Sequence, residues 1–206
     1  MTRTDASRLG ALLWSATLVA GLIGVVRQRR EAQQVRRGAL PPDGPDGDRA
    51  PERPYRPSAA AISRWIPARP TTRAGRIATG LWCAPLTVIG LSVAALSGTR
   101  PQWDSARHCF VATGVGGPSR FALRLVGAGA NTVGQVVLCT SDAPSPRLLD
   151  HEAVHVRQGE RLGVLLVPAY LWLNALYGYR DNPLEHAARR GSRQMHALTS
   201  TRPDGD

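Results

Sequence analysis

The sequence contains no lysine: all 26 basic residues are arginine, against 15 acidic residues, and the formal net charge is +11. Aromatic residues are scarce too, at 5% of 206 residues. Residues 27–76 carry a net charge of +7, but this segment has few aromatic side chains on which bases could stack and no recognisable nucleic-acid-binding module. We therefore interpret the arginines as determinants of membrane orientation, and we expect no nucleic-acid partner.

Cysteine is also rare. Cys83, Cys109 and Cys139 fit neither the spacing of a disulfide framework nor that of a zinc ribbon. Cys83 falls inside an apolar run, which leaves Cys109 and Cys139 as a possible disulfide pair if their segment faces an oxidising compartment. The alternative is that both are unpaired small hydrophobic residues in a core. The sequence does not choose between the two.

Two long runs lack charge altogether, residues 9–26 and residues 77–96. Each is long enough to span a bilayer. Arg27, Arg29 and Arg30 follow the first run directly, which disfavours a cleavable signal peptide. We predict transmembrane helices at 9–26 and 77–97; the alternative is that one run is a core helix of a soluble protein.

The segment between the two runs, residues 27–76, is rich in Arg and Pro, and its Pro-, Gly- and Asp-rich part at 38–60 is typical of a disordered tether. Because positive loops stay in the cytoplasm, this arginine distribution predicts a disordered cytoplasmic loop at 27–76. The N-terminus (1–26) and a domain at 98–206 would then lie on the opposite, extracytoplasmic side. The chain is thus expected to be a multi-pass membrane protein whose partner is the lipid bilayer.

Within 98–206, three short β-rich stretches at 108–114, 121–127 and 132–139 are separated by Gly, Pro and Asn, and they predict a small three-stranded sheet. Residues 133–138 precede the loop into the next helix. They could form an edge strand that holds an extended peptide at the rim of a cleft, or a strand that only packs beneath that helix.

The next helix carries the motif His151-Glu152-Ala153-Val154-His155, of the HExxH type. Residues four apart share one helix face, so the two imidazoles can bind one Zn²⁺ while Glu152 reaches the water at the metal. With five His and five Glu in the chain, about 0.003 chance occurrences of the pattern are expected. Ser145 and Pro146 supply a plausible N-cap and first helical residue.

A catalytic zinc site requires a third protein ligand and an open position for water. The downstream candidates are Asp181, Glu185, His186 and His196. We favour Glu185, in the first turn of a last helix predicted at 182–198. The alternative is that Asn182 and Glu185 form a capping box, in which the carboxylate serves only backbone N–H groups. A helix at about 168–177, ended by Gly178, is expected in between, either buried in the domain or resting against the bilayer.

The stretches 151–163, 167–171 and 179–185 resemble a group of largely uncharacterised bacterial zinc-peptidase-like proteins, similar to the gluzincins. The resemblance covers residues 131–190. It implies His151, His155 and Glu185 as metal ligands and Glu152 as the catalytic carboxylate. Ala153 and Gly159 depart from the expected pattern, because bulkier residues are expected there.

We therefore predict an α+β protein with two transmembrane helices, a small β-sheet and a helical, HExxH zinc-peptidase-like domain in a bacterial cell membrane. Its predicted function is Zn²⁺-dependent hydrolysis of a peptide or protein substrate, with Glu152 as general base. The alternative is an inactive membrane scaffold or partner-binding protein that retains the fold. Further candidates are Arg157 and Gln158 for substrate contact, and Asp150 or Asp181 for orienting a ligand imidazole.

Overall fold

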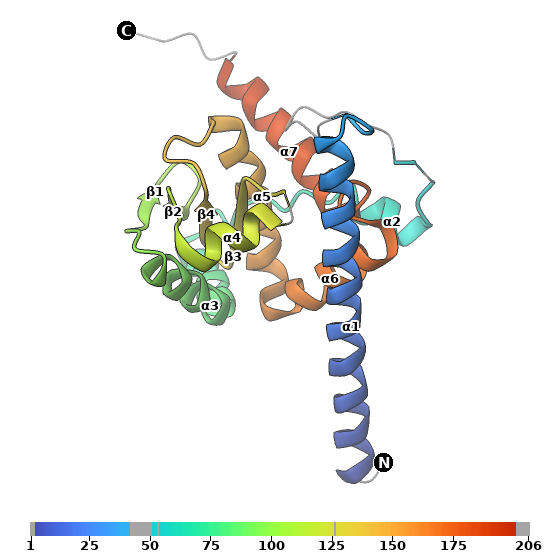
Figure 1. Cartoon of the computed structure of the whole chain (residues 1–206). Coiled ribbons are helices and arrows are strands. Elements are labelled where there is room, and N and C mark those ends of the chain that lie inside the picture. The colour runs from blue at the N-terminus through green and yellow to red at the C-terminus, as the bar shows by residue number, and fades with distance from the viewer. Residues whose placement is uncertain (1–2, 42–50, 53, 126, 201–206) are drawn as a thin grey trace, which may run out of the picture.

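The computed structural model describes residues 3–41, 51–52, 54–125 and 127–200, and of residues 3–13 and 196–200 only the backbone. The elements in chain order are α1 (Arg3–Arg36), α2 (Pro57–Ile62), α3 (Arg73–Leu96), β1 (Gln102–Asp104), β2 (Cys109–Ala112), α4 (Gly117–Leu125), β3 (Ala130–Val133), β4 (Val136–Cys139), α5 (Pro146–Leu162), the 3-10 turn η1 (Gly163–Leu165), α6 (Leu166–Tyr177) and α7 (Pro183–Ser200). Figure 1 shows the sheet beside the helices α5, α6 and α7, with α1 running down past them.

The four strands form one mixed sheet in the order β1-β2-β4-β3. β1 and β2 are antiparallel, β2 and β4 are parallel, and β3 and β4 form an antiparallel hairpin in which Val133 is opposite Val136. The parallel pair requires a crossover, and α4 and β3 lie within it. β4 is therefore an interior strand, and β3 is an edge strand.

Alternate residues of β4 face the two sides of the sheet, because strand side chains alternate. Val136 and Leu138 join the apolar core beneath α3 and α4, together with Ala94 and Leu123. On the opposite face, Val137 and Cys139 pack with Val156 of α5 and with Cys109 and Ala130. The sheet is thus a layer between α3 and α5, and this packing fixes the HExxH helix against β3 and β4.

The close approach of α3 to the sheet depends on glycine. Gly134, in the β3–β4 turn, has φ +64°, and a Cβ atom there would lie 2.3 Å from the backbone N of Thr87. A Cβ atom on Gly90 of α3 would likewise lie 2.6 Å from the carbonyl oxygen of Val133. Thr87 Oγ1 also accepts a hydrogen bond from Gln135 N at 3.1 Å. One face of α3 is therefore held against the hairpin that carries β3.

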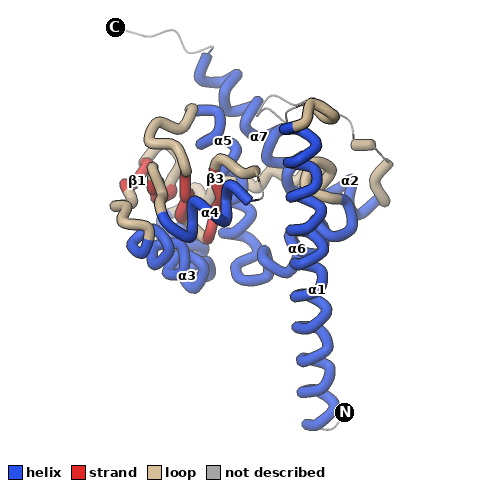
Figure 2. The backbone as a smooth tube through the Cα atoms, in the orientation of Figure 1, coloured by secondary structure: helices blue, strands red, loops and turns tan. Residues whose placement is uncertain are grey.

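α5, η1 and α6 form a helical hairpin, and α1 packs along α6 (Figure 2). Gly21 lies against Leu171, and Gly24 lies against the side chain of Asn174. Arg27 donates to the carbonyls of Ala175 and Leu176 at the end of α6. The helices α1 and α6 run in the same direction, so the N-terminal part of α1 extends beyond η1, the tip of the hairpin.

The helices predicted at the HExxH motif, at 168–177 and at 182–198 are confirmed as α5, α6 and α7. The third β-rich stretch was predicted as one strand, but it turns at Gly134 into the β3–β4 hairpin, and residues 136–138 belong to the interior strand β4 rather than to an edge. The prediction of a strand at 121–127 is wrong, because these residues mostly belong to α4. The alternation of Phe121, Leu123 and Leu125 fits a strand equally well, but Pro118 starts a helix that buries Leu123 and leaves Phe121 exposed. The first β-rich stretch is β2, and β1 was not foreseen.

The predicted disordered loop at 27–76 is also wrong in part. α1 continues past Val26 to Arg36, and residues 57–62 form the short helix α2, which packs on α7. Of the Pro-, Gly- and Asp-rich tether, residues 42–50 and 53 lie outside the described part of the chain. The three cysteines are free and buried, so no disulfide joins Cys109 to Cys139.

Among the residues whose side chains are described, one helix, α3, is long and apolar enough to cross a bilayer. The predicted span at 9–26 falls partly on residues 3–13, of which only the backbone is described. Residues of the 27–76 segment contact the domain, and the assignment of the two to opposite membrane sides stays a prediction. Arg69 donates to the Ala106 carbonyl at 2.6 Å, Arg161 to the Ala68 carbonyl at 3.0 Å, and Tyr55 to the Asp181 carbonyl at 2.8 Å.

Candidate metal centre

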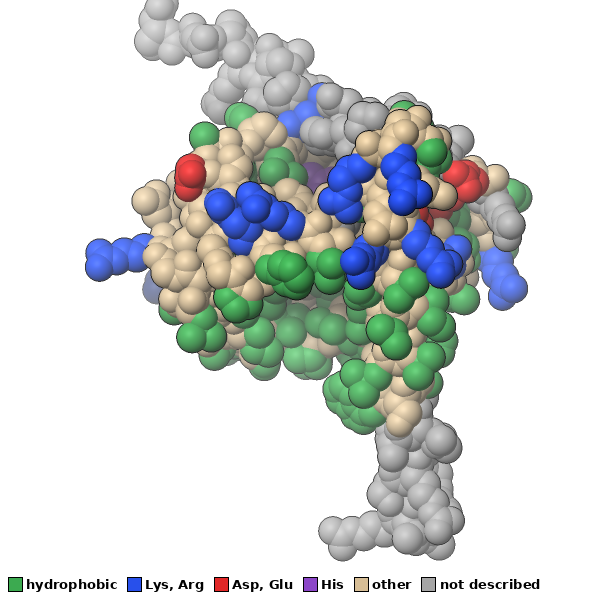
Figure 3. Space-filling view, in the orientation of Figure 1, with side chains coloured by type: hydrophobic (Ala, Val, Ile, Leu, Met, Phe, Trp, Pro, Cys, Tyr) green, Lys and Arg blue, Asp and Glu red, His purple; other side chains and the backbone are tan. Residues whose placement is uncertain are grey.

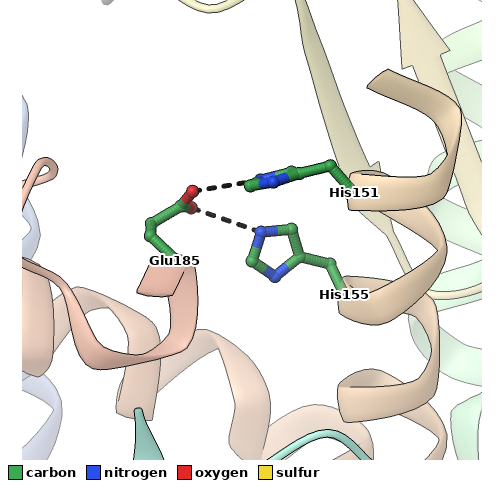
Figure 4. Close-up of side chains that lie close together, drawn as sticks. All are labelled: His151, His155 and Glu185. Atoms are coloured by element: carbon green, nitrogen blue, oxygen red, sulfur yellow. Dashed lines mark hydrogen bonds and ion pairs between the residues drawn. The ribbon is translucent and has the colours of Figure 1, made fainter. Parts of the chain in front are cut away.

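The HExxH helix begins where its capping residues predict. Ser145 is the N-cap, its hydroxyl accepts from Leu148 N at 3.2 Å, and Pro146 follows as the first helical residue. His151 and His155 are one turn apart, and their ring centroids are 5.0 Å from each other. Both side chains point from α5 toward the first turn of α7, where Glu185 faces them (Figure 4).

Glu185 does not cap its own helix. Asn182 Oδ1 accepts from Leu184 N at 3.0 Å, and Asn182 N donates to the Tyr179 carbonyl at 3.3 Å, so the backbone donor that a capping box would use is already bonded. The Glu185 carboxylate instead lies 3.2 Å from Nε2 of His151 and 3.3 Å from Nε2 of His155. The interpretation of Glu185 as a ligand is therefore the one that its position supports.

The separation of these atoms fits a tetrahedral metal. Zn–N bonds of about 2.0–2.1 Å and Zn–O bonds of about 2.0–2.2 Å place neighbouring ligand atoms about 3.3–3.5 Å apart at a tetrahedral angle. His151 Nε2 lies 3.2 Å from Glu185 Oε2 and His155 Nε2 lies 3.3 Å from Glu185 Oε1, so each imidazole has this separation from one of the two oxygens. With one ligand atom from each residue, the three atoms lie within 4.8 Å of one another. Two neutral imidazoles and one carboxylate are also a ligand set that zinc accepts.

The three side chains are coupled electrostatically. Burial alone would lower the pKa of His155, but the facing Glu185 carboxylate outweighs this and raises it to about 9. Burial would likewise raise the pKa of Glu185, yet the two imidazoles hold it well below its usual range. In the metal-free protein, an imidazolium and a carboxylate thus pair inside the domain. A divalent cation can replace the proton in this pair.

Two further side chains hold the ligands. Gln158 is fully buried, and its Oε1 lies 2.9 Å from Nδ1 of His155, while its amide nitrogen donates to the Leu184 carbonyl at 3.4 Å. Because the amide nitrogen has an acceptor there, Oε1 accepts from Nδ1–H and leaves Nε2 free for a metal. Tyr170 of α6 donates its hydroxyl proton to Glu185 Oε1 at 2.7 Å. Burial raises the pKa of Tyr170 well above its usual value, so the hydroxyl stays a donor.

Glu152 is buried beside the two imidazoles, and the edge strand β3 fixes its position. Thr132 donates its hydroxyl proton to Glu152 Oε2 at 2.6 Å. This contact links the carboxylate that the motif assigns to catalysis with the edge strand β3. Nothing in the spacing of the sequence indicates Thr132, since it lies 20 residues upstream and acts through the sheet.

Several predicted roles are not supported. Asp150 pairs with Arg107 at 2.8 Å, rather than with a ligand imidazole. Asp181 lies 4.0 Å from His186, whose ring packs on Tyr55, and neither belongs to the cluster around Glu185. Arg157 contacts Met195, and Gln158 supports His155 instead of lining a substrate site. The side chain of His196 lies outside the described residues.

No family model, curated protein or solved structure matches this chain. The resemblance to zinc peptidases at 131–190 therefore stays a prediction. Its departure at Gly159 has a local cause: a Cβ there would lie 3.6 Å from Cys83 Sγ of α3 and 3.5 Å from Leu166, so a larger side chain would push α3 away.

Proposed function

We propose that the protein is a membrane-anchored, zinc-dependent hydrolase and that its reaction is cleavage of a peptide bond. The observation that carries the proposal is the convergence of His151, His155 and Glu185 from two separate helices, with one ligand atom of each within 4.8 Å of the others. When bound, Zn²⁺ supplies a Lewis acid that polarises the substrate carbonyl and acidifies water. These three residues would hold the metal.

Glu152 is the general base of this proposal. Its carboxylate takes a proton from the attacking water and delivers it to the leaving amine nitrogen. The hydrogen bond from Thr132 at 2.6 Å restrains one of its oxygens and leaves the other for proton transfer. Tyr170 holds Glu185 from the side of α6, and Gln158 keeps His155 in the tautomer that presents Nε2.

Strand β3 favours a peptide as the substrate. Within the described residues, β3 pairs with β4 on one side only, and its Thr132 reaches the catalytic carboxylate. An extended peptide can add to such an edge through main-chain hydrogen bonds. A strand laid along β3 would run directly past Glu152, which is the arrangement that hydrolysis of its backbone requires.

A non-catalytic scaffold is the second candidate, and the burial of the ligands favours it. His151 and His155 are each 8% exposed, and Glu185 is 3% exposed. A closed site of this kind can hold a metal for stability alone. The scaffold and the hydrolase share the ligands but differ in what Glu152 does.

The test uses the purified full chain, its zinc content, and hydrolysis of a mixed peptide library. The hydrolase proposal predicts that wild type and Glu152→Gln bind zinc equally, whereas only wild type cleaves peptides. Glu160→Gln is a matched control, because Glu160 is a buried acid of the same helix that bonds Gln135 rather than the site. Zinc binding with no cleavage by wild type, or cleavage unchanged in Glu152→Gln, would contradict the hydrolase proposal.

A further inference from the structure

Large apolar side chains are exposed in a restricted part of the surface. Among the described residues, all except Trp103 and Phe121 lie on α1, α3, η1 and α6. Leu81 of α3 is 71% exposed, Leu165 of η1 is 58% exposed and Leu176 of α6 is 64% exposed. A soluble monomer rarely leaves so many large apolar groups together in water. We call this surface, formed by the outer sides of the four elements, the apolar face.

The four elements of the apolar face are in contact, so it is continuous. α1 packs along α6, and Thr17 Oγ1 lies 3.4 Å from Trp172 Nε1. η1 joins α6 directly and abuts α3, where Gly163 lies against the indole of Trp82. Figure 3 shows apolar side chains gathered over the lower part of the molecule and on the adjoining side of α1.

The composition of the apolar face is compatible with the hydrocarbon region of a bilayer. Residues 14–26, 77–96 and 162–179 contain no charged residue. Hydroxyl groups on α3 bond back to their own helix: Ser92 Oγ donates to the Val88 carbonyl at 2.8 Å and Thr87 Oγ1 to the Cys83 carbonyl at 3.1 Å. Asn174, the amide on α6, is buried against Gly24. The hydroxyl groups of Thr87 and Ser92 therefore need no water.

Arginine and tryptophan border the apolar face. Arg27, Arg29 and Arg30 follow the uncharged run 14–26 of α1, and Arg73 and Arg76 precede the uncharged run 77–96 of α3. Figure 3 shows basic side chains immediately above the apolar region. Trp82 of α3 and Trp172 of α6 are 52% and 43% exposed. Arginine beside anionic headgroups and tryptophan at the interface are the usual flanks of a membrane-inserted surface.

α3 lies along this surface and does not cross it. Its inner face packs on the β3–β4 turn through Gly90 and Gly134. The residues before α3 bond the domain through Arg69 and Ala68, and the residues after it continue into β1. A helix fastened at both ends and along one face can only enter a bilayer sideways, together with the domain.

We propose that the apolar face is inserted into one leaflet of an anionic phospholipid bilayer, with α3 and the η1 tip lying in the plane of the interface. Amphipathic elements of this kind bury their apolar side to about 5–10 Å. α1 runs deeper, because its N-terminal part extends beyond η1. The loop at 51–72 and the domain then share one side of the membrane. This inference specifies the membrane attachment of the proposed function and does not depend on the metal.

The test places a fluorescent label on the full chain in vesicles of phosphatidylglycerol and phosphatidylcholine. Single cysteines are introduced as Leu81→Cys, Leu165→Cys and Leu176→Cys. Gln194→Cys is the control, because Gln194 is an exposed residue of α7 outside the apolar face. The three native thiols are buried and do not compete for the label. We expect acyl-chain quenchers to quench the labels at 81, 165 and 176 strongly and the label at 194 weakly.

Two outcomes would overturn the proposal. Labels at 81 and 165 that respond only to water-soluble quenchers would leave the apolar face in solvent, and labels shielded from both kinds of quencher would indicate a covering protein. A loss of peptide cleavage alone would contradict only the hydrolase proposal, because quenching is measured without a substrate or zinc.

Two more measurements test the orientation and the charge. An impermeant thiol reagent should modify Ser58→Cys and Gln194→Cys from the same side of oriented vesicles, and labelling from opposite sides would contradict the proposal. Replacing Arg29 and Arg30 by Gln should weaken the preference for phosphatidylglycerol by about fivefold per arginine, whereas Arg190→Gln on α7 should not. An unchanged lipid preference in the Arg29→Gln, Arg30→Gln variant would contradict the role of the arginine border.

Discussion

Gln158 accepts a hydrogen bond from His155 Nδ1 at 2.9 Å and joins this ligand to α7 through the Leu184 carbonyl. The same side chain therefore sets the tautomer of one ligand and the position of the helix that carries another. Partners of this kind affect a metal site without touching the metal.

Replacing Gln158 by Ala is expected to weaken zinc binding by about 10- to 100-fold, the usual effect of removing a residue that orients a ligand. Chelator competition on the full chain measures the change. Gln135→Ala is the matched control, because Gln135 bonds the same helix through Glu160 at 2.7 Å, away from the ligands. Equal zinc affinities in the two variants would contradict the role assigned to Gln158.

Tyr170→Phe removes the hydroxyl that bonds Glu185 at 2.7 Å. We expect zinc affinity to fall by about tenfold, because one oxygen of the ligand loses its restraint inside the domain. Tyr177→Phe, on the same helix but packed edge-on against Tyr55, should leave zinc affinity unchanged. An affinity unchanged in Tyr170→Phe would show that Glu185 is held by its helix alone.

Thr132→Val should separate binding from catalysis. The methyl group keeps the shape of the side chain but removes the donor to Glu152 Oε2, so we expect normal zinc content and a kcat lower by about tenfold or more. Thr140→Val, which removes a hydroxyl bonded to the Gly129 carbonyl, is the control. A parallel loss of zinc would mean that Thr132 supports the fold of the site rather than the carboxylate.

Zinc binding should depend on pH through His155. Its pKa in the metal-free protein is raised to about 9, so the imidazole is protonated at neutral pH and must release its proton to bind a metal. Apparent zinc affinity is then expected to rise about tenfold per pH unit up to about pH 9 and to level off above it. Calorimetry at pH 7 in two buffers of different ionisation enthalpy should show about one proton released.

The same pair makes the stability of the metal-free protein depend on pH. A raised histidine pKa contributes stability that is fully present below the unfolded value of about 6.5 and is lost as the pH rises through about 9. The lowered pKa of Glu185 contributes stability that is lost as the pH falls below the ordinary carboxyl range. Thermal unfolding at a series of pH values, with a chelator present, measures both contributions to stability. His155→Gln should remove the loss of stability at alkaline pH.

The sequence predicts those parts of the site that depend on local signals. Ser145 with Pro146 and Gly178 mark helix ends, and the spacing of His151 and His155 needs only a helix. Thr132 and Tyr170 could not be found this way, because they reach the site through a sheet and through a separate helix. Gln158 has helical spacing from His155, yet its role depends on a carbonyl of α7.

The membrane orientation inferred from counting arginines stays a prediction. The positive-inside rule uses only the number of arginines, whereas in the structure Arg27 and Arg69 donate to backbone carbonyls of the domain, and Arg161 of the domain donates to the Ala68 carbonyl. Those contacts tie the loop to the domain, which a count of charges along the chain does not predict. The uncharged run at 77–96 is visible in the sequence, whereas the role of Gly90 and Gly134, which let the hairpin approach one face of α3, follows only from the structure.

X-ray absorption at the zinc edge, on the purified full chain, tests the central claim most directly. We predict one zinc per chain, bound by two imidazole nitrogens and carboxylate oxygen at about 2.0–2.2 Å, with imidazole scattering halved in His155→Ala. A chain that binds no zinc, or a spectrum with sulfur at about 2.3 Å, would contradict a centre built from His151, His155 and Glu185.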